Sequence, residues 1–246
     1  MSSYAEQNLV RGLSFLAERQ AAIANNLANV DTTSYKRRVA VADQEPSRFH
    51  AMLAEQMPTI RYREQSDYGR GIVRQTDNQL DVALDANSWL RVQNAGGAQF
   101  FTRNGQLQIA KDGRLTTRGG EAVLDTSGNP IQLGAGELAP SKITISPNGQ
   151  IQDPITGQTW GPIAIVAVDK PDGLQPTGDG LYIDTLSQKP TTVGDGLQQG
   201  FLEGSNVDSL QELVQMITVE RSFAATQKAL TGVGRLQENI IASILR

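Results

Sequence analysis

Three aspartates spaced four residues apart are the nearest approach in this chain to a catalytic carboxylate cluster. They are Asp77, Asp81 and Asp85. On a helix this spacing would place them on one face, and on a strand they would project from one side. Paired carboxylates can hydrolyse a glycosidic bond by acting as acid and nucleophile. The residues alone leave that chemistry open, beside the plainer role of a solvated edge or a turn.

Other catalytic and metal-binding patterns find little support. His50 is the single histidine and the chain has no cysteine, which argues against His-dependent triads, zinc centres and disulfides. The glycines at 134 and 136 make too short a match for a dinucleotide-binding loop. Residues 125–129 read as a turn and lack the spacing of a calcium loop. We therefore expect no enzyme activity, no cofactor and no metal.

Composition favours a protein that associates with others. The chain has 246 residues, a net charge of -4 and only 39% hydrophobic residues. A low apolar content fits an elongated or oligomeric protein that keeps apolar surface for its partners. The sequence has no block of basic residues, so we do not expect nucleic acid as a partner. No apolar run reaches the roughly 18–20 residues that span a bilayer, and the N-terminus lacks the apolar core of a secretory signal. We therefore expect no membrane insertion and no cleaved signal peptide.

The N-terminal segment repeats apolar residues every seven positions, in two series offset by four. This pattern predicts a helix from about Leu9 to Val30 that is reserved for packing against other helices. An ordinary amphipathic helix covering its own core is the alternative. The two series are Leu9, Leu16, Ile23 and Val30, and Leu13, Gln20 and Leu27.

A second, longer heptad pattern fills the C-terminus. Ser209 and Glu212 have the spacing of a capping box, and Asp208 also suits a helix N-terminus. No proline follows, so a helix of about 57 Å is possible, whereas globular helices average about 11–12 residues. Such a helix is too long for its own small β domain to cover. Its series are Met216, Phe223, Leu230, Gln237 and Ile244, and Val219, Thr226, Val233 and Ile240, with Leu210, Leu213 and Ile217 widening the apolar face.

Between the helices the chain changes to short apolar stretches separated by glycine-rich turns. Residues 37–75 suggest a linker with one short helix over 49–57, and residues 76–205 a β-rich domain, either an antiparallel sandwich or barrel-like. Asn104-Gly105 and Asp112-Gly113 are the strongest hairpin signals. The other expected strands are Leu80–Leu84, Leu90–Gln93, Ile131–Leu133, Ile143–Ile145, Ile163–Val168 and Leu181–Asp184.

The predicted fold is therefore α+β, with paired long N- and C-terminal helices, coiled-coil-like, around a central all-β domain. Residues 1–36 and 206–246 would form one coiled-coil domain of terminal helices.

Several of these segments resemble the flagellar rod and hook axial proteins. Asn25–Lys36, with the sequence NNLANVDTTSYK, is similar to their N-terminal signature, and Glu203–Val207 to their C-terminal one. Within the β region, the resemblance rests on Leu80–Leu84, Trp89–Gln93 and Thr102–Gly105. Trp89-Leu90 and the modest gap between Tyr35 and Asp81 point to the proximal rod members. Two features depart from the pattern, because Ser34 stands where glycine is usual, and Ala86, Asn87 and Ser88 replace a glycine-containing turn.

The resemblance implies a structural subunit of the basal-body rod that transmits torque. It implies export through the flagellar type III apparatus, a periplasmic location in the rod, and assembly with copies of itself and with other rod proteins. A distal rod or hook-type protein, a secreted β-scaffold carbohydrate-active enzyme, and a phage-tail or secretion-tube subunit are the alternatives. The expected assembly interface comprises Leu9, Leu13, Leu16, Ile23, Asn25, Asn26, Leu27, Asn29, Val30, Leu213, Met216, Val219, Phe223, Leu230, Val233, Ile240 and Ile244.

Overall fold

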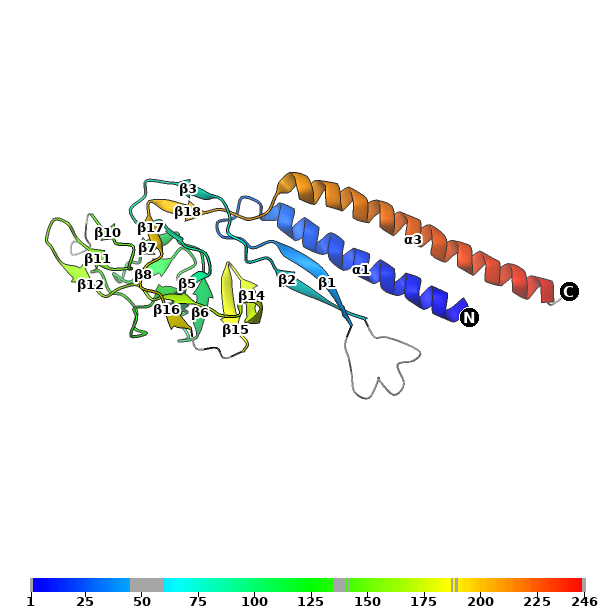
Figure 1. Cartoon of the computed structure of the whole chain (residues 1–246), viewed down its shortest axis with the longest axis horizontal. Helices are drawn as coiled ribbons and strands as arrows, with labels where there is room; N and C mark the ends of the chain where they lie inside the picture. Colours follow the sequence, from blue (N-terminus) through cyan, green and yellow to red (C-terminus); the bar gives the residue numbers. More distant parts are fainter. Residues whose placement is uncertain are drawn as a thin grey trace. The chain divides into compact units, whose positions relative to one another are not determined.

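The computed structural model describes the backbone of residues 2–44, 60–134, 140, 142–186, 188 and 190–244 (Figure 1). Its internal contacts divide the chain into two compact units. Unit 1 comprises residues 1–30, 37–67 and 207–246, and unit 2 comprises residues 31–36 and 68–206. Each unit therefore combines segments that lie far apart in the sequence.

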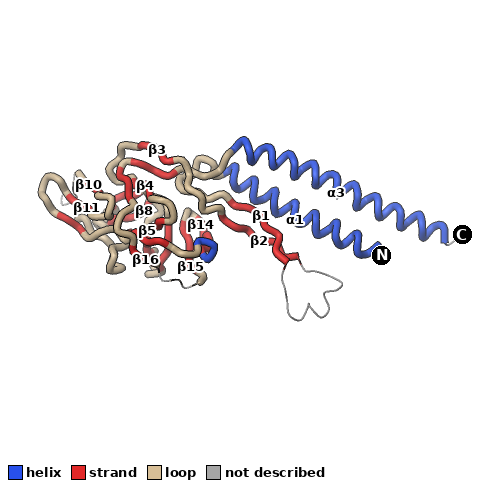
Figure 2. The backbone as a smooth tube through the Cα atoms, in the orientation of Figure 1, coloured by secondary structure: helices blue, strands red, loops and turns tan. Residues whose placement is uncertain are grey.

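The described part of unit 1 consists of two helices and a strand pair. Helix α1 (Ser2–Ala28) and helix α3 (Ser209–Ile244) lie side by side and antiparallel, and α1 also contacts strand β1 (Figures 1 and 2). Strands β1 (Arg38–Gln44) and β2 (Ile60–Ser66) form an antiparallel ribbon. Asp208 caps α3, because its carboxylate accepts the backbone N–H groups of Leu210 at 3.0 Å and Gln211 at 3.1 Å.

Residues 37–75, expected to be a linker, contain in their described part the strands β1 and β2, which pair along their whole lengths. Strand pairing depends on the partner strand as well as on local pattern, so the sequence of one strand does not identify its partner. The short helix expected over 49–57, with His50 in it, lies outside the described residues. Helix α1 begins before Leu9 and ends at Ala28, two residues short of the expected Val30.

Unit 2 is an assembly of short strands, and every pairing among its described strands is antiparallel. Its largest sheet has the order β14-β15-β6-β5-β9-β8-β7, with β13 pairing both β5 and β16. The strands of this sheet are β5 (Ser88–Gln93), β6 (Gln99–Thr102), β7 (Leu107–Ile109), β8 (Leu115–Thr117), β9 (Ala122–Val123), β13 (Ile165–Ala167), β14 (Leu174–Gly178), β15 (Leu181–Asp184) and β16 (Thr191–Thr192).

The other strands described in unit 2 form three smaller sheets. One is the three-stranded sheet β10 (Thr144–Ile145), β11 (Ile151–Gln152) and β12 (Thr159–Trp160). The others are the pairs β17 (Leu197–Gln199) with β4 (Val82–Leu84), and β18 (Phe201–Glu203) with β3 (Val73–Gln75). A short 3₁₀ helix, η2, spans Pro171–Gly173. The α+β class is therefore confirmed, with a helix at each end and a central β-rich region.

Aliphatic side chains from several of these strands form the main core of unit 2. Val82, Leu84, Leu90 and Val92 are fully buried in it. These four residues lie in two segments, Leu80–Leu84 and Leu90–Gln93, for which short apolar runs predict strands. Burial of this apolar surface is the main force that holds the sheets together.

Of the two hairpin signals, one was confirmed and one was wrong. Asp112-Gly113 lies in the connection between β7 and β8, which pair directly, and Gly113 has a φ of 83°. Asn104-Gly105 joins β6 to β7, which are not neighbours in the sheet. Gly105 is required for another reason, since a Cβ atom there would lie 1.7 Å from the carbonyl oxygen of Val82. Close backbone approach, and not a tight turn, explains this glycine.

No helix among the described residues has the length and apolar character needed to cross a membrane.

Candidate functional site

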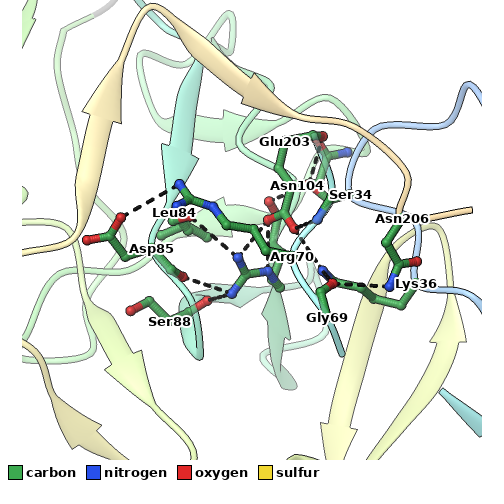
Figure 3. A network of polar contacts seen from close by, with 12 residues as sticks. Ser34, Lys36, Gly69, Arg70, Leu84, Asp85, Ser88, Asn104, Glu203 and Asn206 are labelled. Carbon is green, nitrogen blue, oxygen red and sulfur yellow. Dashed lines mark hydrogen bonds and ion pairs between the residues drawn. The ribbon is translucent and has the colours of Figure 1, made fainter. Parts of the chain in front are cut away.

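A buried ion cluster in unit 2 is centred on Glu203, at the end of strand β18 (Figure 3). Lys36 places its Nζ atom 2.8 Å from one carboxylate oxygen, and the side chains of both residues are fully buried. The same oxygen accepts the backbone N–H of Gly71 at 2.9 Å, and Lys36 also donates to the carbonyl of Gly69 at 2.7 Å. Arg103 donates to the second carboxylate oxygen through Nε at 2.9 Å and Nη2 at 2.6 Å. The single carboxylate thus bridges two buried cations.

The guanidinium of Arg103 is held by several partners. Beyond Glu203 it donates to the backbone carbonyls of Ser88 at 2.6 Å and Asp85 at 3.1 Å. It also lies over the ring of Trp89, 5.7 Å from its centroid, in position for a cation–π interaction. A planar guanidinium with several fixed donors suits this position, which a lysine could not fill equally well.

The carboxylate of Glu203 is ionised in spite of its burial. Burial is the largest single influence and would raise its pKa, but the charges of Arg103 and Lys36 act in the opposite direction. Together with the hydrogen bonds from Lys36 and the Gly71 N–H, these charges hold the pKa of Glu203 below its usual value. The cluster therefore holds two buried cations stably only while Glu203 remains charged.

Ser34 joins this cluster through an unusual backbone conformation. Its φ of 56° lies in the left-handed region, where glycine is favoured. The Ser34 N–H donates to the carbonyl of Glu203 at 2.9 Å, and its hydroxyl donates to the carbonyl of Arg103 at 2.7 Å. The departure from glycine noted in the sequence therefore has a structural counterpart, because the hydroxyl adds a buried hydrogen bond that glycine would lack.

A second buried carboxylate organises unit 1. Asn26, on α1, donates its side-chain amide to Glu212 of α3 at 3.1 Å, and both residues are fully buried. Arg37 donates from Nε to the other oxygen of Glu212 at 2.6 Å. Asn26 also pairs with the backbone of Arg38, accepting its N–H at 2.8 Å and donating to its carbonyl at 2.9 Å. One polar cluster therefore ties α1, α3 and the start of β1 together.

The predicted assembly residues fall into four groups in the structure. Ile23, Asn26 and Val219 are buried, whereas Asn25 and Leu213 are exposed. The side chains of Ile240 and Ile244 lie outside the described part of the chain. The remaining members are half-buried: Leu9, Leu13, Leu16, Leu27, Asn29, Val30, Met216, Phe223, Leu230 and Val233.

The aspartates that suggest carbohydrate chemistry have individual structural roles. Asp77 and Asp85 are exposed, and Asp85 lies 3.6 Å from Arg70 as an ion pair. Asp81 is buried and accepts the side-chain amide of Asn78 at 3.1 Å, which stabilises the turn before β4. Within the described ranges, no group of three or more histidine, cysteine or acidic residues is arranged to hold a metal ion.

Sequence patterns give little sign of the two carboxylate clusters. Lys36 and Glu203 both belong to segments that carry the family resemblance, yet 167 positions separate them. The spacing of Glu212 from Ser209 suggests a capping residue, but its side chain binds Asn26 and Arg37 instead. The sequence offers one signal for this cluster, which is that Glu212 is a charged residue within an apolar stretch of helix. That signal does not identify Asn26 or Arg37 as its partners.

Three family models match this chain. The model described as flagella basal body rod protein matches residues 7–36, and the flagellar hook protein FlgE/F/G D1 domain matches residues 83–153. The model for the C-terminal part of the flagellar basal body rod FlgEFG proteins matches residues 198–243. These matches include the segments that hold Lys36, Arg103, Glu203 and Glu212.

Similarity to individual rod proteins extends over most of the chain. The flagellar basal-body rod protein FlgF of Salmonella typhimurium is 30% identical over 227 residues, which cover 87% of this chain and 88% of that protein. FlgG of Agrobacterium fabrum is 29% identical, covering 85% and 87%, and FlgF of Caulobacter vibrioides is 26% identical, covering 89% of each. The chain belongs to the flagellar basal-body rod protein family.

Proposed function

We propose that this chain is a structural subunit of the proximal rod, and that it assembles with copies of itself and with related rod proteins into a helical tube that transmits torque. Export through the flagellar type III apparatus and assembly in the periplasm belong to this proposal. The family membership supports a role in the basal-body rod and a role that is not enzymatic.

The observation that carries the proposal is an exposed apolar face at the start of α3. It consists of Leu210, Leu213, Val214 and Ile217, which are 70%, 49%, 57% and 51% exposed. Their spacing places them on one side of the helix, opposite the buried Glu212 and Val219. Exposed apolar patches on soluble proteins commonly mark interaction sites. A neighbouring subunit packed against this face would remove these four apolar side chains from water.

The heptad seams supply further surface for the same assembly. Phe223 and Leu230 are half-buried within unit 1, so part of each side chain stays available to a neighbour. Alternating spacings of three and four residues suit packing of the coiled-coil type. In a heterologous contact, one surface of a subunit binds a different surface of the next subunit. Repetition of such a contact builds an open helical stack when the rotation between subunits does not close into a ring. A rod is such a stack.

The proximal position is favoured over the distal one by the modest length between Tyr35 and Asp81. The principal alternative is a distal rod or hook-type axial protein, since relatives named FlgF and FlgG have nearly equal identity to this chain. Imaging of purified basal bodies at side-chain resolution would locate the chain. Density for it in the distal part of the rod would overturn the proximal assignment.

A substitution on the exposed face tests the structural role. Ile217→Asp places a charge where a neighbour must exclude water, which disfavours assembly, while the exposed position leaves unit 1 folded. We expect a soluble chain with unchanged helicity, no rods in basal-body preparations and no swimming. Gln227→Asp, an exposed polar position on the same helix, is the matched control and should swim normally. Normal rods and motility with Ile217→Asp would contradict the proposed function.

A further inference from the structure

We propose that Glu212 selects the register in which α3 packs against α1. The inference rests on the proposed function in one respect, because it explains how one subunit pairs its own helices correctly among many copies. The carboxylate supplies specificity, and the apolar seam supplies most of the attraction.

The apolar seam of α3 defines its own register poorly. Met216, Phe223 and Leu230 repeat every seven residues, so a one-heptad shift of α3 would bring Phe223 to the place of Met216 and Leu230 to the place of Phe223. Burial of apolar surface is not directional, so at these two positions the shifted pairing would keep its apolar contacts. In coiled coils, a single buried polar residue commonly decides among such alternatives.

Of the two donors that meet Glu212, the amide of Asn26 is held by groups outside α3, whereas the guanidinium of Arg37 also donates to Gln215 of α3 at 3.5 Å. Asn26 is fixed by two hydrogen bonds to the backbone of Arg38, at 2.8 Å and 2.9 Å. Arg37 belongs to the same stretch, and its carbonyl accepts the N–H of Asp67 at 2.7 Å. The amide of Asn26 is therefore a preset donor to α3, and the anchored backbone of Arg37 keeps its Nε within reach of the same carboxylate. The carboxylate of Glu212 accepts one donor on each of its two oxygens.

A one-heptad shift would bring Val219 to the place of Glu212. Valine has no acceptor, so the buried amide of Asn26 would lose one partner and the guanidinium of Arg37 would lose its closest carboxylate. Loss of an acceptor by the buried amide of Asn26 carries a desolvation penalty. Only the register that brings Glu212 to these donors avoids that penalty, and this makes Glu212 a positioning residue.

The absence of cysteine from the whole chain allows a direct test of register. Ala22 of α1 and Gln215 of α3 line the same cavity in unit 1, so the pair Ala22→Cys with Gln215→Cys reports the observed register. The pair Ala22→Cys with Ser222→Cys reports the register shifted by one heptad. A short thiol-specific bismaleimide would be applied to the purified full chain, and cross-linked monomer would be quantified on denaturing gels.

We expect only the Ala22–Gln215 pair to cross-link while Glu212 is present. In Glu212→Leu, the Ala22–Ser222 pair should yield at least tenfold more cross-linked product than in its parent, and swimming should be lost. Glu212→Gln keeps an acceptor oxygen for these donors and should retain the observed register. Ile23→Ala is the control, because it weakens the packing of α1 without touching the carboxylate, and it should give no shifted product.

Two results would overturn the proposal. If Glu212→Leu cross-linked only through Gln215, the apolar seam alone would define register. If it cross-linked through neither pair, Glu212 would be needed for pairing itself and not for the choice of register. Neither result bears on the proposed function, which is tested separately by Ile217→Asp on the exposed face of α3.

Discussion

The ammonium of Lys36 lies 2.8 Å from the carboxylate of Glu203, across 167 positions of sequence, and the side chains of both residues are fully buried. This contact joins the segment that follows α1 in the chain to the strand that precedes α3. Both partners belong to unit 2, so the β-rich unit holds the two segments that connect it to the terminal helices.

Removal of the central carboxylate should destabilise unit 2 strongly. Glu203→Ala leaves Lys36 and Arg103 as buried cations without their anion, and breaking a buried pair in this way costs about 3–5 kcal/mol. Urea unfolding of the purified chain would measure the loss. Asp112→Asn breaks the exposed pair with Arg114 and is the control, for which a clearly smaller change is expected. Equal losses in the two variants would show that the buried cluster has no special role.

The stability of unit 2 should fall in acid, partly through Glu203. Its pKa in the folded chain is held below the value of about 4.3 that a glutamate has when unfolded. The resulting stabilisation is fully present above the unfolded pKa and is lost as the pH falls toward the folded pKa. Urea midpoints measured between about pH 3 and pH 6 should therefore decline in acid. The decline should be shallower in Glu203→Gln, and an unchanged slope would contradict this assignment.

Ser34 should respond differently to two small substitutions. Ser34→Gly relieves the left-handed backbone but removes the hydrogen bond to Arg103, so the two effects should largely cancel. Ser34→Val removes the same bond and adds a β-branched side chain at positive φ, which costs a further 1–3 kcal/mol, roughly. Thermal unfolding should place valine well below glycine. Equal stability of the two variants would argue against backbone strain at this position.

Gly105 should tolerate no side chain. Gly105→Ala would put a Cβ atom 1.7 Å from the carbonyl oxygen of Val82, which requires backbone movement in a strand of the core. We expect a loss of several degrees in melting temperature, since destabilisation of about 1 kcal/mol shifts it by roughly 2–4 °C at this chain length. A methyl group added at Gly194 would meet no atom within 4 Å, so Gly194→Ala is the control and should be close to neutral.

The C-terminal helix should gain stability from substitution of its internal glycines. Gly232 and Gly234 lie within α3, and an added Cβ atom at either would meet nothing within 4 Å. Alanine in place of glycine in a helix interior contributes about 0.5–1 kcal/mol. Circular dichroism of Gly232→Ala should show a higher melting temperature of the helical signal. A decrease would indicate that the glycine backbone is needed at this position within the monomer itself.

Periodic features of the sequence were sufficient to predict the two helices and several of the strands. The heptad series in α1 and α3 and the apolar runs in β4, β5 and β15 act over a few residues, so local pattern was enough. The glycine in Asp112-Gly113 likewise indicated a real hairpin, because positive φ is a property of one residue and its neighbours. The family resemblance rested on segments of the same local kind.

Partners distant in sequence were decided by the tertiary structure alone. The pairing of β1 with β2, the contact of Gly105 with Val82, and the ion clusters of Glu203 and Glu212 all join segments whose approach no short pattern records. A carboxylate in a sequence offers two acceptor oxygens to any donor, and only the path of the folded chain determines which donors reach it. Burial then stabilises the observed pairing strongly, because a buried charge that loses its partner destabilises the fold.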